Sequence, residues 1–138
     1  MSIVSFIPPL LSLSKQLIGE TMSEVQIWHN PRCSKSRNVM TLLEESGVEA
    51  EVVKYLDEEL TESMIKELLL KLDIDAIDLM RTKEDKFKEL MLEKVGDEGV
   101  LIRAMTRFPI LIERPIVIKG NKAVIGRPIE KVIALVNS

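Results

Sequence analysis

The sequence predicts an α/β fold built on a mixed four-stranded sheet. Short apolar runs typical of strands occur near both ends of the region from Glu24 onward, and helical periodicities lie between them. The predicted order of elements is β-α-β, a helical insertion, then β-β-α. At 138 residues, with 46% hydrophobic and 30% charged residues, the chain has the length and composition of one globular domain.

The first part of this region predicts two strands joined by a helix. Strands are expected at residues 25–28 and 50–55, and a helix at 36–46 that Gly47 ends. A helical connection favours parallel pairing of the two strands. The insertion follows as four helical segments, predicted at residues 61–72, 77–80, 83–92 and 98–105.

The last third of the chain predicts a β-hairpin followed by a helix. Strands are expected at residues 116–119 and 122–125, because Gly120-Asn121 between them is a tight-turn signal. Pro128 is expected near the first position of a final helix. This order of parts is that of a thioredoxin-like fold. The predicted buried face of the final helix consists of Ile129, Val132, Ile133 and Val136.

Residues 1–23 differ from the rest of the chain. They are largely apolar with two charged residues, and they lack the basic start and small-residue cleavage site of a secretory signal. One interpretation is an amphipathic helix at residues 10–18 that packs on the domain or on a membrane surface. We favour a leader from an early translation start, because Met22 precedes the first strand. The expected division is therefore a leader at 1–23, outside the fold, and one domain at 24–138.

Composition excludes several classes of function. A net charge of −3 argues against nucleic acid as a main partner, because a broad basic surface is missing. No apolar run approaches the roughly 20 residues of a membrane-spanning helix, so no membrane partner is expected. One cysteine and one histidine supply neither a disulfide nor metal-ligand spacing. We expect no metal, no bound cofactor and a reduced, cytoplasmic protein.

Residues 28–38 contain the only cysteine and the only histidine. Cys33 lies where a predicted strand turns into a predicted helix, and helix N–H groups there favour a thiolate and an anionic ligand. The alternative is a buried, inert cysteine. Ser34 and Ser36 are candidates to donate hydrogen bonds to the sulfur or to an oxyanion, and His29 either orients the loop, assists proton movement or makes a structural hydrogen bond. Nearby charges that favour the thiolate are those of Arg32, Lys35 and Arg37.

Three further arginines are candidates for anion binding. Arg114 and Arg127 each precede a proline in an apolar context, and Arg81 follows a short apolar helical segment. A guanidinium presents a planar fork of donors that suits tetrahedral oxyanions. The alternative for each arginine is a structural role, such as a surface ion pair of little energetic value.

Taken together, these motifs resemble one known family. His-Asn-Pro-x-Cys-x-x-Ser-Arg-Asn at 29–38, Pro-Ile-Leu-Ile-x-Arg-Pro-Ile-Val at 109–117 and Gly-Arg-Pro at 126–128 are similar to the motifs of glutathione/glutaredoxin-dependent arsenate reductases. The resemblance extends over residues 24–136. It implies a thioredoxin-like fold with a helical insertion, and an arsenate reductase domain at 24–138.

The resemblance also implies a mechanism. Cys33 would attack arsenate to form a thiol-arsenate adduct, glutathione as co-substrate would join the arsenic, and glutaredoxin would resolve the mixed species to release arsenite. His29 and Ser36 would lower the pKa of the cysteine, and the Arg114-Pro115 bond would be cis. Because the chain has no second thiol, the electrons must come from outside it. The expected contacts to the oxyanion are Arg81, Arg114 and Arg127.

Two alternative functions stay open at this point. A Spx-like transcriptional regulator, which binds RNA polymerase, shares the cysteine turn, but such proteins typically have Cys-x-x-Cys where this chain has Cys33-x-x-Ser36, and they tend to lack the arginine at 127. A glutathione-linked thiol oxidoreductase acting on another substrate is the second alternative. Arg32 and Ser34, on either side of the cysteine, depart from the family pattern and affect the expected anion affinity.

Overall fold

A mixed four-stranded sheet forms the centre of the protein. The computed structural model describes residues 24–138, so the leader predicted at residues 1–23 lies outside the described residues. The strand order is β2-β1-β3-β4. β1 (Val25–Trp28) pairs in parallel with β2 (Ala50–Val53) and antiparallel with β3 (Ile116–Lys119), and β3 pairs antiparallel with β4 (Lys122–Ile125). The predicted α/β fold with a mixed sheet is confirmed.

The strands lie close to where the sequence predicts them. β1, β3 and β4 have the predicted bounds, and Gly120 has a φ of 62°, a left-handed conformation that glycine adopts without steric cost in the β3–β4 turn. β2 ends at Val53, earlier than predicted, because a 3₁₀ turn, η2 (Tyr55–Asp57), begins two residues later. This turn leads the chain away from the sheet at the end where Trp28 and Val53 lie.

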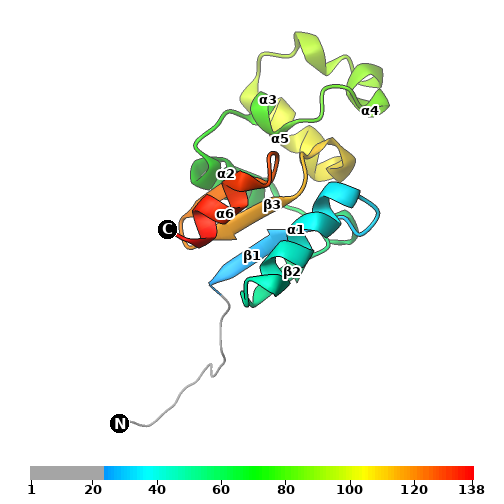
Figure 1. Ribbon diagram of the computed structural model, residues 1–138. Helices are drawn as coiled ribbons and strands as arrows, with labels where there is room; N and C mark the ends of the chain where they lie inside the picture. The colour runs from blue at the N-terminus through cyan, green and yellow to red at the C-terminus, as the bar shows by residue number, and fades with distance from the viewer. Residues whose placement is uncertain (1–23) are drawn as a thin grey trace.

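Helices cover both faces of the sheet (Figure 1). α1 (Ser34–Glu45) and α6 (Glu130–Val136) lie on one face, where they pack against Val25, Ile27 and Val117. α2 (Glu62–Leu72) and α5 (Glu98–Arg107) pack on the other face, in a core that includes Trp28. The alternation of side chains along a strand explains this division, because neighbouring residues of β1 point to opposite faces.

The helical insertion begins and ends on this second face of the sheet, and its middle part extends beyond one end of the sheet (Figure 1). It contains α2, α3 (Ala76–Leu79), α4 (Asp85–Glu89), η3 (Leu92–Lys94) and α5, and ends in η4 (Pro109–Leu111). The helix predicted at 83–92 is therefore two short pieces, and Met91 between them has a φ of 55°. An antiparallel bridge joins Met80 to Ile112, and the Arg81 N–H donates to the Leu111 carbonyl at 2.7 Å. These bonds fix the insertion to the segment that enters β3.

The final helix differs from its prediction. It begins at Glu130, so Pro128 lies before the helix rather than near its first position. Its buried residues are Val132 and Leu135, whereas Ile133 is 41% exposed. Val132 is buried and Ile129 and Val136 pack against the same core, as predicted, but Leu135 is buried in place of Ile133, because the helical period alone does not determine the contact with β3 and β4.

Gly126 is the point of closest approach between this helix, α1 and the segment before β3. A Cβ placed on Gly126 would lie 3.0 Å from Pro115 Cγ, 3.2 Å from Val132 Cγ2 and 3.3 Å from Val39 Cγ2. We expect Gly126→Ala to lower the free energy of unfolding by about 1–3 kcal/mol, the usual cost of overpacking, as measured by urea denaturation. Gly96→Ala, where no atom lies within 4 Å, is the control. Equal effects of the two substitutions would contradict this packing.

Candidate active site

Three chain segments meet at one edge of the sheet. Trp28, the last residue of β1, is aligned with Val53 of β2 and with Ile116 of β3. Beyond this row the chain runs from Trp28 into the loop that carries Cys33. On the other side, Arg114 stands two residues before Ile116, at the same edge, because β3 runs antiparallel to β1. The sheet register therefore brings a thiol and a guanidinium together from distant parts of the sequence.

Cys33 is the N-cap residue of α1. Its backbone is extended, with φ −96° and ψ 123°, its carbonyl accepts from the Arg37 N–H at 3.0 Å, and no side-chain oxygen caps the helix. The backbone N–H groups of Lys35 and Ser36, in the first turn of α1, act on this thiol and favour its ionised form. The side chain is 8% exposed, and Arg127 Nη2 lies 3.5 Å from Cys33 Sγ.

These contacts determine the acidity of the thiol. Burial by itself raises the pKa of Cys33, but the Ser36 N–H, the hydrogen bond and charge of Arg114 and the Lys35 N–H together outweigh burial and lower the pKa below its ordinary value. A lowered pKa increases the fraction of thiolate, the reactive form, near neutral pH. The surroundings of Cys33 are therefore those of a reactive cysteine and not of an inert core cysteine.

His29 and Ser36 form a buried pair behind the thiol. His29 Nδ1 lies 2.6 Å from Ser36 Oγ, which also accepts from the Asn30 N–H at 3.0 Å. Burial, followed by the charges of Lys54 and Arg37, lowers the pKa of His29, so the ring is neutral at neutral pH. The Ser36 hydroxyl is thus engaged with the loop, and the serine acts on the thiol through its backbone N–H. The histidine holds this serine in place.

Two of the three predicted arginines converge on Cys33. Arg127 Nε donates to the Arg114 carbonyl at 2.7 Å while its Nη2 faces the sulfur. Arg114 Nε is fully buried and has no hydrogen-bond partner within residues 24–138. The Arg114-Pro115 bond is cis, as the resemblance predicted, and so is Arg127-Pro128.

Arg81 lies next to the segment before Arg114. Its Nη2 forms a salt bridge with Glu84 Oε2 at 3.0 Å, and its Nη1 is buried without a partner in the described part of the chain. Buried donors without acceptors are energetically costly, and an oxyanion supplies such acceptors. The structure thus places Arg114 and Arg127 at the thiol, and Arg81 pairs with a glutamate beside the segment that leads to Arg114.

Two titratable residues of this region, Glu113 and Tyr55, were not predicted as site residues, because no motif in the sequence marks them. Burial raises the pKa of Glu113, and the charge of Arg127 lowers it in part. Burial also raises the pKa of Tyr55 to about 12. The charge of Arg114 acts against this rise, and the charge of Cys33 adds to it. Their proximity to the thiol follows from the pairing of distant segments. The single available hint in the sequence is that Glu113 directly precedes Arg114.

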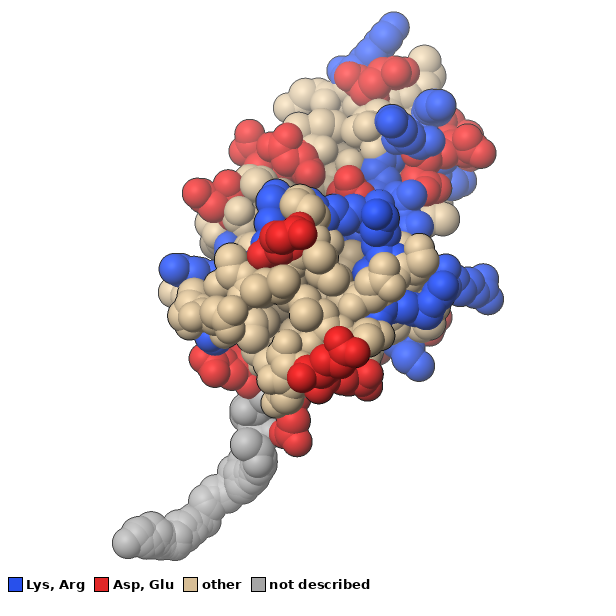
Figure 2. Space-filling view, viewed as in Figure 1, with Lys and Arg blue, Asp and Glu red and all other residues tan. Residues whose placement is uncertain are grey.

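Positive charge gathers on the face that carries this site. Figure 2 shows a belt of Lys and Arg side chains from the loop before α6 to the start of α1, although the chain as a whole has a net charge of −3. A local basic surface of this kind attracts anions. Within residues 24–138 no His, Cys, Asp or Glu side chains are grouped to hold a metal ion. No helix there is long and apolar enough to span a membrane.

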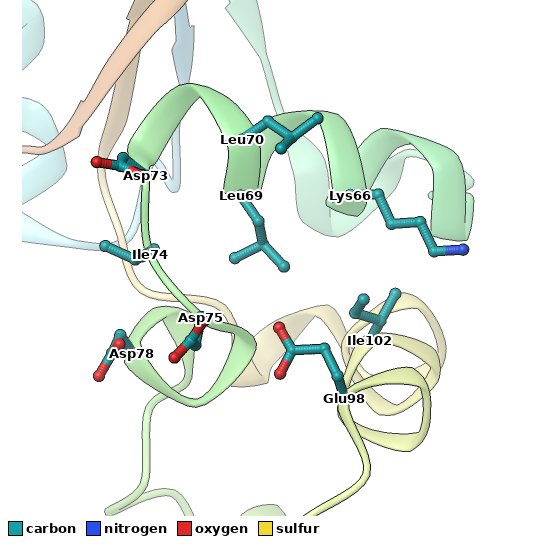
Figure 3. Close-up of a pocket in the computed structure, with 9 residues that line it drawn as sticks. All are labelled: Lys66, Leu69, Leu70, Asp73, Ile74, Asp75, Asp78, Glu98 and Ile102. Atoms are coloured by element: carbon teal, nitrogen blue, oxygen red, sulfur yellow. The ribbon is translucent and has the colours of Figure 1, made fainter.

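A separate groove of about 630 Å³ lies between α2, α3 and α5. Leu69 lies at its centre and the carboxylates of Asp75 and Glu98 face it from below (Figure 3). Glu98 Oε2 accepts a hydrogen bond from the Ala76 N–H at 2.8 Å, which satisfies the start of α3. None of the predicted site residues lines this groove. A smaller pocket of about 290 Å³, lined in part by Lys35 and Arg127, adjoins the thiol site.

Comparison with known proteins identifies the family of the chain. The sequence profile of the ArsC family matches residues 28–135, which include Cys33, Arg81, Arg114 and Arg127. The chain belongs to the ArsC family. An arsenate reductase of Neisseria meningitidis serogroup A is 48% identical over 116 residues, which cover 83% of this chain and 99% of the relative. The uncharacterized protein YfgD of Escherichia coli K12 is 50% identical over 115 residues, which cover 82% of this chain and 97% of that protein.

Solved structures of this family share the fold. The arsenate reductase from Vibrio cholerae superimposes with a TM-score of 0.79 at 40% identity, over 83% of this chain and 98% of that chain. The predicted thioredoxin-like fold with a helical insertion is confirmed. The resemblance to arsenate reductases proposed from the three motifs is confirmed as well.

The acidity of Cys33 can be measured directly. We expect the rate of Cys33 alkylation by iodoacetamide to titrate with a midpoint below the usual pKa of a thiol. Arg114→Ala should move this midpoint upward, because it removes both a hydrogen bond and a positive charge from the thiolate. Arg107→Ala, at the exposed end of α5, is the matched control and should leave the midpoint unchanged. Identical midpoints for wild type and Arg114→Ala would refute this account.

Proposed function

We propose that this ArsC family protein reduces arsenate to arsenite, with Cys33 as the nucleophile and with glutathione and glutaredoxin as the source of electrons. The observation that carries the proposal is the convergence of Arg114 and Arg127 on a thiol of lowered pKa. The named activity of the Neisseria and Vibrio relatives supports it.

The first step is attack of the Cys33 thiolate on arsenic(V). A sulfur–arsenic bond forms, one arsenic–oxygen bond breaks, and the leaving oxygen takes up protons and departs as water. Both reactants are anions, so their repulsion opposes the step. The guanidinium groups of Arg114 and Arg127 and the N–H groups at the start of α1 offset this repulsion and stabilise the charge of the transition state.

The second stage needs a thiol from outside the chain. Reduction of arsenic(V) to arsenic(III) takes two electrons, which two thiols supply when they join as a disulfide. Cys33 is the only cysteine, so glutathione provides the second thiol and glutaredoxin resolves the mixed species. Overall, arsenate and two thiols give arsenite, a disulfide and water. Arg127 beside the sulfur favours this reaction over a regulatory role, because the Spx-like proteins tend to lack that arginine.

The activity has a direct test. Purified protein with arsenate, glutathione and glutaredoxin should form arsenite, measured by chromatographic separation of the two arsenic species. Cys33→Ser should abolish arsenite formation, since no other residue of the chain carries a thiol. Omission of glutathione or of glutaredoxin from the wild-type reaction is the control for the electron source. Absence of arsenite in the complete wild-type reaction would rule out the proposal.

Substitution of Arg114 tests whether the site arginines act in function or only in the structure. Arg114→Ala should lower kcat/KM for arsenate by about tenfold to hundredfold, because a hydrogen bond to a charged group contributes about 1.5–3 kcal/mol. The melting temperature should change little, since the substitution also removes a buried donor, Arg114 Nε, that has no partner within the described chain. Arg107→Ala serves again as the control. A large drop in melting temperature with unchanged turnover would instead assign Arg114 a structural role.

A further inference from the structure

Tyr55 is the only tyrosine of the chain, and it lies at the sheet edge that carries Cys33. Its side chain is 1% exposed and its ring stacks on Trp28, with ring centroids 6.0 Å apart and an angle of 22° between the planes. Such a stack fixes the orientation of a tyrosine ring, and the polar end of a buried tyrosine usually finds a hydrogen-bond partner.

The sheet register places Tyr55 opposite Arg114 across the cysteine loop. Val53, Trp28 and Ile116 form one row of the sheet. Tyr55 follows Val53 by two residues and Arg114 precedes Ile116 by two, so both lie just beyond this row. The turn η2, which begins with Tyr55, packs against η4, the segment that leads to Arg114.

The Tyr55 hydroxyl makes no hydrogen bond within residues 24–138. No donor or acceptor of residues 24–138 bonds to it, and it is not one of the two fully enclosed side-chain atoms without a partner, Arg81 Nη1 and Arg114 Nε. The residue as a whole is buried, with 1% of its surface exposed, and the described residues leave its hydroxyl without a partner. The hydroxyl lies within electrostatic range of Arg114, Cys33 and Arg127.

We propose that the Tyr55 hydroxyl donates a hydrogen bond to the oxyanion that Arg114 and Arg127 hold against Cys33. This inference rests on the proposed function and adds a substrate contact to it. A neutral donor supplies a hydrogen bond without adding a further positive charge to the site. Such a donor also favours a tetrahedral oxyanion, which offers several hydrogen-bond acceptors, over an anion that offers charge but few acceptors.

The hydroxyl stays protonated over the working range of the site. Burial raises the pKa of Tyr55 to about 12; the charge of Arg114 lowers it and the charge of Cys33 raises it. The pKa of Cys33 is shifted the opposite way, below its ordinary value. A pH range therefore exists in which the thiolate and the tyrosine hydroxyl are present together.

The substitution Tyr55→Phe tests the proposal, because it removes the hydroxyl and keeps the ring that stacks on Trp28. Inorganic phosphate is a suitable probe, since it is a tetrahedral oxyanion that is not reduced. We expect the Kd for phosphate, measured by calorimetry, and the KM for arsenate each to rise about tenfold. The pH midpoint of Cys33 alkylation without anion should stay close to that of wild type, because the N–H groups and Arg114 still act on the thiolate.

The outcomes separate this inference from the proposed function. If wild type binds phosphate and reduces arsenate, and Tyr55→Phe has the same Kd and KM, the role of Tyr55 is refuted while the function stands. If wild type binds neither anion, both are refuted. A variant that does not fold is replaced by wild type with its single tyrosine isotopically labelled. Addition of phosphate should then shift the Tyr55 ring resonances, and unchanged resonances at saturating phosphate would overturn the proposal.

Discussion

The start of α1 is the constraint on which the rest of the site depends. Helix N-termini leave backbone N–H groups without partners, and the side-chain oxygen of a serine, threonine or aspartate usually accepts hydrogen bonds from them. Here Cys33 is the N-cap residue and makes no side-chain capping hydrogen bond, and the N–H groups of Lys35 and Ser36 lower the pKa of its thiol. A thiolate is the better acceptor, so the helix favours the ionised form. The helix start and the reactive state of the cysteine therefore stabilise each other.

The arginines around this thiol are held in advance of any ligand. Arg127 is fixed through its Nε bond to the Arg114 carbonyl, and the Gly126 N–H donates to the Pro115 carbonyl at 2.8 Å. Arg114 Nε and Arg81 Nη1 remain without acceptors within residues 24–138. Donors aimed in advance at an anion need no reorganisation when it binds. The desolvation cost of these two buried donors is met at folding.

Much of the fold followed from local patterns, and the exceptions have physical reasons. The bounds of β1, β3 and β4 were predictable from apolar runs and a glycine turn, and the cysteine loop from its motif. The burial of Leu135 in α6 instead of Ile133 was not, because several apolar residues compete and the contact with β3 and β4 decides among them. The position of Tyr55 beside Cys33 was equally hidden, since it depends on the register of strands that are distant in sequence.

The division of charge around Cys33 also bears on the proposed single-cysteine reaction. The groups that lower its pKa are backbone N–H groups and the guanidinium of Arg114, whereas His29 has a lowered pKa and acts through Ser36. The thiolate is therefore independent of the protonation of the histidine. A thiol of low pKa is also a good leaving group when another thiolate attacks its disulfide or mixed species. In the reaction proposed above, the contacts that prepare Cys33 for its first attack would also favour its release by a thiol from outside the chain.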